Sequence, residues 1–566
     1  MTVRPPVARL LVLLTSGTFL LVTRVAAQET PAGEPALAPA SALTTPGAGL
    51  VRAHLRFLSA DLLMGRAPGT PGAQVAAHYI AAQFEALGLE PGGPTGSYFQ
   101  PVRLLGVTPE VSLVLGIRRQ TTALEHGRDF VAWPERPDSA LSVDGEIVFV
   151  GYGIQAAEWD WDDYKGTPLA GKILLMLVND PGLTDASRFN GRTLTYYGRW
   201  TYKLEQAARM GAVGAILIHT DKTATYPWSV VRNSWTGEQI MLDRRVVESL
   251  QFGAWMTADA ARRILAETGR DFEALVRRAQ QRQFRPIGLG AHAVVRLRSR
   301  IRQIEGANVV GRLDGADPDR RHEAVVLTAH YDHLGVGLPV DGDSIYNGAE
   351  DNASGVAALL AAAAGFSRAG TQPGRTLLFI ATTAEEAGLL GAEAYVTEPI
   401  MPLEQTVAVL NIDRANLRGA THDAVALGSE RSTLGQHFRR AAAQEGLEAS
   451  RDPNPGAGQF YRSDHFPFAR AGVPVLAFQA GAQFADRPPD WGAEQEARYT
   501  QERYHQPSDE FREDFAYEGA LQQVRLLIRL GWSLAAGSEF PEWHPDSEYR
   551  SAGERLRLRR ARSPDR

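Results

Sequence analysis

From about residue 306 to residue 535, short segments that are apolar throughout alternate with segments whose hydrophobic residues recur every three or four positions. The first kind predicts buried β-strands, and the second predicts α-helices. The predicted strands are Val325–Thr328, Thr376–Ala381, Val407–Ile412 and Val475–Phe478. The predicted helices are Gly355–Ala364, Leu390–Val396, Leu434–Ala443 and Phe515–Ala535. Apolar strands separated by helices indicate a mixed, mostly parallel sheet flanked by helices, so we expect an α/β fold here.

The preceding part of the chain has a different pattern. Two helices are predicted at Val51–Ser59 and Gly72–Leu87, before the texture changes near Phe130. Strand-like runs follow at Glu146–Val150, Lys172–Val178 and Ala215–His219, with one helix at about Thr201–Met210. Seven of the ten tryptophans fall between Trp133 and Trp255, which sets this stretch apart from the rest. The pattern predicts a separate β-rich module inserted between two parts of the α/β domain.

These patterns predict six segments. They are a signal peptide (1–27), an Ala/Pro-rich linker (28–49), the N-terminal part of the α/β domain (50–125), the inserted module (126–295), the main α/β domain (296–540) and a basic C-terminal tail (541–566). Ala, Pro, Thr and Gly dominate the linker, so we expect it to be flexible. The arginine-rich tail is expected to be a solvated, frayed end.

The first residues have the composition of an export signal. Arg4 and Arg9 precede an apolar run from Leu10 to Val22, and Val25-Ala26-Ala27 offers small residues for cleavage. The alternative is a membrane anchor, but the run is short and interrupted, whereas a spanning helix needs about 20 apolar residues. We therefore expect cleavage near Ala27, an exported protein that is periplasmic or secreted, and no stable membrane insertion afterwards.

Composition and charge exclude several classes of protein. Hydrophobic residues make up 44% of the chain and charged residues 22%, which is typical of a globular protein and excludes a disordered one. The net charge of -6 argues against a nucleic-acid partner, because phosphate contacts need clustered cations. Cysteine is absent, which excludes disulfides, thiolate metal sites and cysteine nucleophiles. Any metal ion must therefore be held by histidines and carboxylates.

Polar residues of this kind follow the predicted strands of the α/β domain. They are His330 and Asp332, then Glu350-Asp351 before a helix, Glu385-Glu386, Asp413, and His505 late in the chain. Each alone is weak evidence, since an Asp beside a helix start is usually an N-cap. Ligands bind at the carboxyl ends of the strands in such sheets, and His with carboxylates suits zinc. Their joint order therefore predicts a metal site at this edge.

At these residues the sequence resembles the secreted bacterial zinc aminopeptidases with a co-catalytic pair of metal ions. Relatives of that family include leucyl aminopeptidases, glutamate carboxypeptidases, glutaminyl cyclases and the transferrin receptor ectodomain. The matching motifs are Gly65-Arg66-Ala67-Pro68-Gly69-Thr70, His330-Tyr331-Asp332, Asp351-Asn352-Ala353-Ser354-Gly355, Glu385-Glu386-Ala387-Gly388, Asn411-Ile412-Asp413, Ser463-Asp464-His465 and Tyr504-His505-Gln506-Pro507-Ser508-Asp509. The resemblance implies the zinc exopeptidase fold, and the module at 126–295 is similar to a protease-associated domain. Arg414 departs from the family, which often has an apolar residue there.

The resemblance also implies a role for each motif residue. Asp351 would bridge two Zn(2+) ions per chain, with His505 and Glu386 completing one site and His330 and Asp413 the other. Glu385 would be the general base, and Asp332 would orient His330. Tyr461, Asp464 and His465 would line the substrate side, and Tyr461 would assist the oxyanion. Relatives also carry a cis peptide bond at the position of Asp351–Asn352, so we expect one here.

We expect an aminopeptidase that removes N-terminal residues from peptides, and three alternatives remain open. A carboxypeptidase would need cations for the terminal carboxylate, which Arg414 and Arg462 could supply. A glutaminyl cyclase would use much of the same constellation. A non-catalytic, receptor-like binding protein would have lost ligands, whereas all are present here. The inserted module is expected to shape access, with Tyr226, Trp228 and Trp235 either facing the cleft or forming the module's own core.

Overall fold

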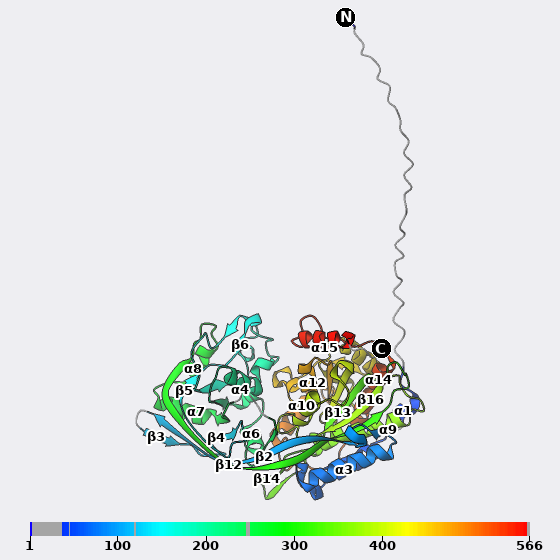
Figure 1. Ribbon diagram of the computed structural model, residues 1–566, viewed down its shortest axis with the longest axis horizontal. Coiled ribbons are helices and arrows are strands. Elements are labelled where there is room, and N and C mark those ends of the chain that lie inside the picture. The colour runs from blue at the N-terminus through cyan, green and yellow to red at the C-terminus, as the bar shows by residue number, and fades with distance from the viewer. Residues whose placement is uncertain (3–36, 45, 118–119, 245–249, 563–566) are drawn as a thin grey trace. The chain divides into compact units, whose positions relative to one another are not determined.

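A computed structural model describes residues 1–2, 37–44, 46–117, 120–244 and 250–562 (Figure 1). The predicted signal peptide, apart from its first two residues, and the linker up to residue 36 lie outside this part of the chain. Within the described residues, no helix combines the length and apolar character needed to cross a bilayer.

The main α/β domain is built on the predicted parallel strands. β13 (Ala324–His330) lies between β16 (Thr376–Thr382) and β17 (Thr406–Ile412), and β17 pairs with β20 (Val475–Gln479), all in parallel. β18 (Asp423–Leu427) runs antiparallel to β20, and β19 (Glu448–Ser450) follows it. These strands form a mixed, mostly parallel sheet, which confirms the predicted fold class.

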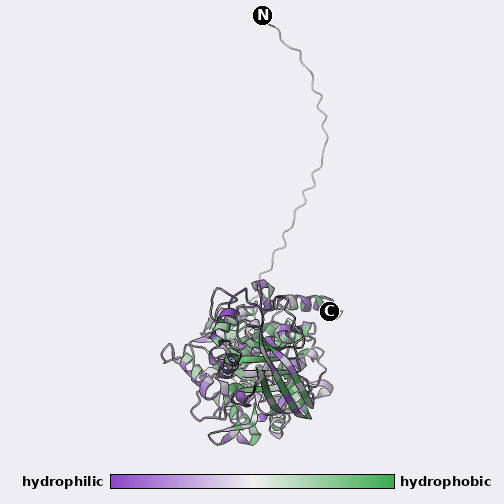
Figure 2. Cartoon of the chain, turned by 90° about the vertical axis from the view of Figure 1, so that its left-hand side faces the viewer, coloured by the Kyte–Doolittle hydropathy of each residue, from purple (hydrophilic) through white to green (hydrophobic). Residues whose placement is uncertain are grey.

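Both faces of this sheet are covered by helices, because alternate residues of each strand point to opposite sides. Val325 and Leu327 of β13 pack with α2 (Ala48–Leu58), α3 (Pro71–Ala86), α9 (Ser354–Ser367) and α14 (Glu518–Ala536). Ala324 and Val326 pack instead with α10 (Leu390–Thr397) and α12 (His465–Ala471). Figure 2 shows hydrophobic residues concentrated on the strands, as this two-sided burial requires.

Two long antiparallel strands lead into and out of the inserted region. β2 (Phe99–Ile117) pairs with β12 (Ile287–Leu313) along almost its whole length. The C-terminal end of β12 pairs with β16, while its N-terminal part pairs with β5 (Ala140–Phe149). One sheet therefore continues from the α/β domain into the inserted region, as the two long strands in Figure 1 show.

The inserted region contains its own part of this sheet and its own cores. Its strands follow the order β5, β8 (Ile173–Leu177), β9 (Gly214–His219), β11 (Phe252–Thr257) and β4 (Phe130–Pro134). α7 (Ala258–Glu267) and α8 (Phe272–Ala279) cover one face, and α4 (Trp200–Arg209) and α6 (Trp228–Trp235) cover the other. We call residues 126–295 the insert. It buries apolar residues on both faces of its part of the sheet, which fits a module with cores of its own.

Shorter elements complete the described chain. They are β1 (Glu90–Pro91), β3 (Gln120–Ala123), β6 (Gln155–Ala156), β7 (Trp161–Asp162), β10 (Gln239–Leu242), β14 (Gly335–Val340), β15 (Asp343–Tyr346), α1 (Ala40–Thr44), α5 (Asp221–Ala224), α11 (Leu434–Gln444), α13 (Trp491–Glu502) and α15 (Arg550–Arg562).

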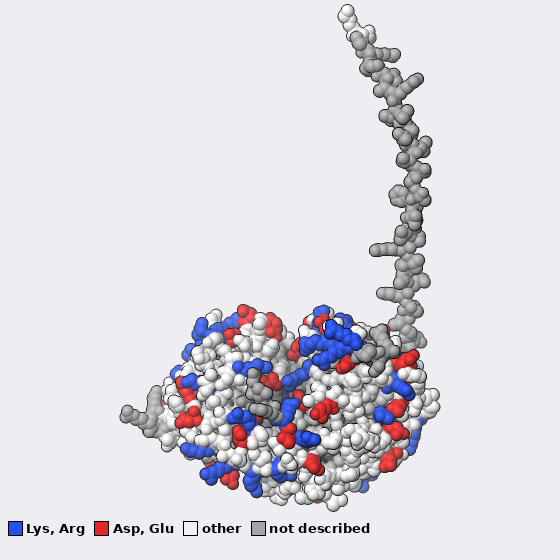
Figure 3. All heavy atoms as spheres, viewed as in Figure 1, with Lys and Arg blue, Asp and Glu red and all other residues white. Residues whose placement is uncertain are grey.

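Both predicted flexible ends differ from the prediction where they are described. Within the predicted linker, α1 buries Ala42 completely, and the Ser41 hydroxyl donates to the Ala369 carbonyl, because small residues can pack closely on α9. The tail is not a frayed end, since residues 550–562 form α15 and Leu556 is buried in the core of the α/β domain. The indole of Trp543 also donates to Gly472. Figure 3 shows the basic side chains gathered over α15, with both charges interspersed elsewhere on that face.

Candidate active site

The first site residues lie where β13 ends. His330 is its last residue and is buried, and its Nδ1 lies 3.2 Å from the Asp332 carbonyl oxygen, which leaves Nε2 facing the carboxylates. The Asp332 carboxylate accepts hydrogen bonds from the backbone N–H groups of Glu385 (3.1 Å) and Glu386 (3.4 Å). Its Oδ1 is 3.7 Å from His330 Nδ1. The predicted orienting contact is therefore made by the Asp332 carbonyl, while the carboxylate positions the Glu385-Glu386 turn after β16.

The loop that carries Asp351 is held from both sides. The Asp509 carboxylate accepts from the N–H groups of Glu350 and Asp351, each at 3.0 Å. The Asn352 side chain donates to the Ile412 carbonyl at the end of β17 and accepts from the Arg414 N–H. The Asp351–Asn352 peptide bond is cis, as predicted. These contacts fix Asp351 beside Asp413, two residues that are far apart in the sequence.

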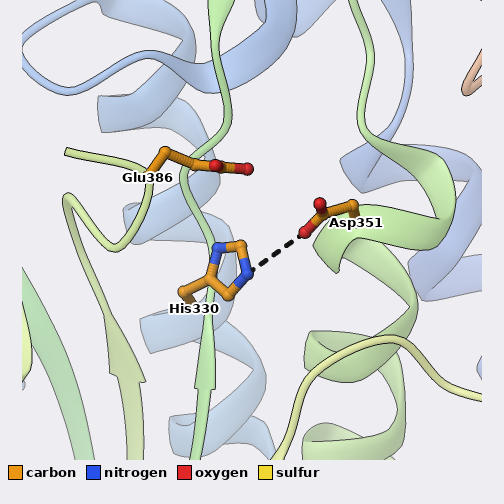
Figure 4. Close-up of side chains that lie close together, drawn as sticks. All are labelled: His330, Asp351 and Glu386. Atoms are coloured by element: carbon orange, nitrogen blue, oxygen red, sulfur yellow. Dashed lines mark ion pairs between the residues drawn. The ribbon is translucent and has the colours of Figure 1, made fainter. Parts of the chain in front are cut away.

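Asp351 presents one oxygen to each of two histidines. Its Oδ1 is 3.3 Å from His330 Nε2, and its Oδ2 is 3.6 Å from His505 Nε2. Asp413 Oδ1 lies 3.4 Å from the same His330 nitrogen, and Glu386 Oε2 lies 3.0 Å from the His505 nitrogen. Figure 4 shows His330, Asp351 and Glu386 converging on one space. We call these five residues the metal cluster, and the structure brings all of them together.

The donor atoms of the metal cluster fit divalent cations. The Nε2 atoms of His330 and His505 are buried and have no hydrogen-bond partner among the described residues. Burial alone lowers the pKa of His505, but the charges of Glu386 and Asp351 outweigh it and raise that pKa to about 10. Buried carboxylates thus surround imidazole nitrogens that lack partners. Zinc prefers this combination of nitrogen and oxygen ligands, and His330, Asp351 and Glu386 bring one donor atom each within 4.8 Å of one another.

Glu385 lies beside the metal cluster but is set further back. Its Oε2 is 3.9 Å from His330 Nε2, and the residue is buried. Burial raises the pKa of Glu385 well above its usual range, and the charges of Glu386 and Asp413 raise it further. The arrangement provides a carboxyl group that exchanges a proton readily and need not be a ligand.

The three predicted substrate residues have different surroundings. Asp464 is fully buried near the cluster, accepts a hydrogen bond from the Thr382 hydroxyl, and has a pKa raised by burial to about 7. The Tyr461 hydroxyl accepts from Arg431 and donates to Glu548, both at 3.1 Å. His465 is fully buried against the Phe460 ring, and burial lowers its pKa to about 3. Tyr461 lines the cavity, but its O–H is already donated to Glu548, and His465 packs in the core.

Several residues at the site escaped prediction. His333 Nδ1 lies 2.7 Å from Glu386 Oε1, and the closeness of this histidine to His330 in the sequence was a usable signal. Ser234 Oγ in the insert lies 2.8 Å from His505 Nδ1, and Asn233 donates to the His505 carbonyl at 3.1 Å. No local pattern relates positions 234 and 505, because folding alone brings them together.

Arg414, the departure from the family pattern, is neutralised within the protein. Its guanidinium is 2.7 Å from Glu496 and lies 4.7 Å from the centre of the Tyr499 ring. Its charge is therefore already paired on the side of the cavity next to Asp413.

A cavity of about 1160 Å³ joins the insert to the metal cluster. It is lined by cluster residues and by Arg199, Tyr226, Ser234 and Trp235 of the insert. Trp235 also stacks on Trp133 at 3.9 Å, and the Trp228 indole donates to Gly127 within the insert. Of the three predicted aromatics, Tyr226 and Trp235 thus face the cavity, while Trp228 packs in the insert.

Part of the chain is similar in sequence to known proteins. The chain is 29% identical over 241 residues to leupeptin-inactivating enzyme 1 of Streptomyces exfoliatus, covering 42% of this chain and 50% of that protein. It is 32% identical over 121 residues to a vacuolar membrane protease of Lachancea thermotolerans, covering 21% of this chain and 11% of that protein. The chain thus spans at most half the length of these curated relatives.

A solved structure shares the fold over most of its length. The aminopeptidase from Aneurinibacillus sp. strain AM-1 superposes with a TM-score of 0.53 and 21% identity, covering 88% of this chain and 97% of that one. Residues 308–529, which contain all five residues of the metal cluster and Glu385, match the profile of peptidase family M28. This match is confined to part of the α/β domain and does not extend into the insert.

Proposed function

We propose that this protein is a zinc-dependent exopeptidase, and specifically an aminopeptidase that hydrolyses N-terminal residues from peptides. The observation that carries the proposal is Asp351, whose two carboxylate oxygens each face a buried histidine nitrogen without a hydrogen-bond partner. The aminopeptidase with the same fold and the similar leupeptin-inactivating enzyme support the peptidase assignment.

Two zinc ions per chain would be held by the metal cluster. Asp351 would be shared, His330 and Asp413 would complete one set of ligands, and His505 and Glu386 the other. Bound zinc supplies a water of lowered pKa and a Lewis acid for the scissile carbonyl. His333 and Ser234 would keep Glu386 and His505 in position, because ligand side chains need such outer contacts to hold their orientation.

Glu385 would transfer the protons of the reaction. As general base it accepts a proton from the attacking water, and as general acid it returns that proton to the leaving amine. Burial raises its pKa, which favours a group that must be deprotonated in one step and protonated in the next. The backbone hydrogen bonds from Glu385 and Glu386 to Asp332 would hold it in place.

The insert would form one wall of the cavity and limit which peptides enter. We retain its likeness to a protease-associated domain as part of the proposal, together with export of the mature chain after cleavage near Ala27. Tyr226 and Trp235 lining the cavity support the access role. The insert would also hold the ligand His505 in position through Ser234. The sequence predicted only a role in access.

A substrate panel with metal analysis tests the proposal. Purified mature protein should contain two zinc ions per chain and hydrolyse aminoacyl anilides, and a chelator should abolish this activity. N-terminally blocked peptides cleaved from the C-terminus would identify a carboxypeptidase instead, and cyclisation of N-terminal glutamine would identify a cyclase. Full activity in metal-free protein would reject the zinc-dependent mechanism.

A further inference from the structure

Among the described residues, three arginines of the cavity have no carboxylate partner: Arg244, which is exposed, and Arg199 and Arg462, which are at least partly buried. The other two cavity arginines are paired, since Arg414 contacts Glu496 at 2.7 Å and Arg470 lies 3.6 Å from both Glu205 and Glu393. Arg199 of the insert has no ion pair or side-chain hydrogen bond within the described part of the chain. Arg462 donates to the Ala224 carbonyl and the Thr225 hydroxyl, and it lies over the Tyr226 ring at 5.0 Å.

The surroundings of Arg199 make its charge costly to the folded protein. Its side chain is 8% exposed, and its Nε is buried without a partner. It precedes α4, where the positive end of the helix dipole disfavours a cation. Burial, and after it the charge of Arg462, lowers the pKa of Arg199 to about 10. A buried cation repelled by a second cation is destabilising unless an anion joins them.

The two arginines face the same cavity as the metal cluster. Tyr504 also lines this cavity, and its ring contacts that of His505 in a tilted arrangement with centroids 4.0 Å apart. An anion held by the arginines would therefore lie in the cavity that the metal cluster lines.

We propose that Arg199 and Arg462 form a carboxylate-binding subsite that recognises the carboxylate of a peptide substrate close to its scissile bond. Guanidinium groups bind carboxylates through charge-assisted and often bidentate hydrogen bonds. The carboxylate is either the C-terminus of a short peptide or the side chain of an acidic residue beside the scissile bond. This inference rests on the proposed function, because it names the class of peptide that the cavity accepts.

Matched pairs of substrates distinguish the two sources of carboxylate. With X as the N-terminal residue preferred in the anilide panel, or Ala if no anilide is hydrolysed, X-Ala is compared with X-Ala amide, and X-Glu amide with X-Gln amide. The wild-type enzyme should prefer the charged member of at least one pair. Arg462→Gln should lower kcat/KM for that member by roughly 10- to 100-fold, as expected when a charged hydrogen bond is lost, and should reduce hydrolysis of the neutral member much less.

Arg470→Gln is the matched control, because Arg470 lines the same cavity but is already paired with carboxylates. It should leave the charged-to-neutral ratio unchanged. Arg199→Lys tests the insert's contribution with the charge retained, and it should lower the ratio because an ammonium cannot bind bidentately. Thermal melts establish that each variant folds. Equal losses on charged and neutral substrates, or no wild-type preference in either pair, would overturn the subsite.

A binding measurement separates this inference from the proposed function. Zinc-loaded Glu385→Gln protein is titrated calorimetrically with X-Ala, X-Ala amide, X-Glu amide and X-Gln amide. The charged member of one pair should bind at least about 10-fold more tightly, and Arg462→Gln should remove that difference. If no substrate is hydrolysed but this difference persists, the proposed function fails and the subsite stands. Equal affinities with intact hydrolysis reject the subsite alone.

Discussion

The insert and the main α/β domain both bury charged residues, but they treat them differently. In the insert, Asp180 accepts hydrogen bonds from the Gly182 N–H (2.9 Å) and the Thr195 hydroxyl (2.6 Å), and Lys203 donates to the Asn179 carbonyl. In the metal cluster, His330 and His505 each have a buried Nε2 without a hydrogen-bond partner in the described structure. Buried polar groups are almost always paired in folded proteins. Asp180 and Lys203 therefore maintain the fold, whereas two such histidine nitrogens beside several carboxylates indicate where a cation belongs.

The largest expected effect is on the shared ligand. Asp351→Ala should remove both zinc ions and abolish activity, because each remaining pair of ligands is too few to hold an ion. Metal analysis after dialysis measures the loss, and the folding of the metal-free variant is checked by its thermal melt. Retention of one zinc ion per chain would contradict the bridging role of Asp351.

The adjacent residues Glu385 and Glu386 test the contrast between a proton-transferring group and a metal ligand. Glu385→Gln should keep both metals and lower kcat by at least ~10²-fold, since it removes the general base. Glu386→Gln should weaken one metal site, because Glu386 Oε2 lies only 3.0 Å from the His505 nitrogen. Metal titration and steady-state kinetics on both variants provide the measurement. Equal metal loss in the two variants would show that their roles are wrongly assigned.

A substitution of a buried charged residue in the insert should lower stability and leave the zinc content unchanged. Asp180→Ala removes the acceptor for the Gly182 N–H and for the N–H and hydroxyl of Thr195. We expect the free energy of unfolding to fall by about 3 kcal/mol, because buried donors are left without an acceptor. Zinc content at a temperature where the variant is folded should be unchanged. Zinc loss without destabilisation would contradict the assignment of Asp180 to the fold of the insert.

The smallest expected effect lies where the two regions meet. Ser234→Ala removes the hydroxyl that contacts His505 Nδ1, and we expect zinc to bind roughly 10-fold more weakly at one site, as when other outer contacts are removed. Thr236→Ala is the control, since that hydroxyl donates to Arg232 within the insert. Chelator competition measures both affinities. Equal affinities in the two variants would show that the insert does not position His505.

The prediction from sequence succeeded where chemistry lies close to a strand end. His330, Glu385 and Asp413 follow apolar runs directly, so a parallel sheet was enough to bring them to one edge. Contacts across the cavity could not be predicted in this way. Ser234 meets His505, and Arg462 reaches Ala224 and Thr225, only because the insert folds against the α/β domain.

The tail shows a second limit. Its many arginines suggested a solvated end, yet Trp543 and Leu556 are buried. The Arg560 guanidinium also lies over the Phe540 ring. A basic average composition does not exclude a few apolar residues at helical spacing. Those residues decide whether the segment packs on the rest of the protein. Cation–π contacts and the long aliphatic stems of arginine also allow a basic helix to cover an apolar surface.

The paired strands β2 and β12 determine how the cavity can open. Their backbone ladder runs without interruption from Ala291 opposite Ile117 to Val309 opposite Phe99. A hinge needs a few residues that can rotate freely, and a continuous ladder offers none along its length. Widening the cavity would therefore bend a paired two-stranded ribbon instead of turning about a few residues. The ladder thus favours one spacing between the insert and the metal cluster.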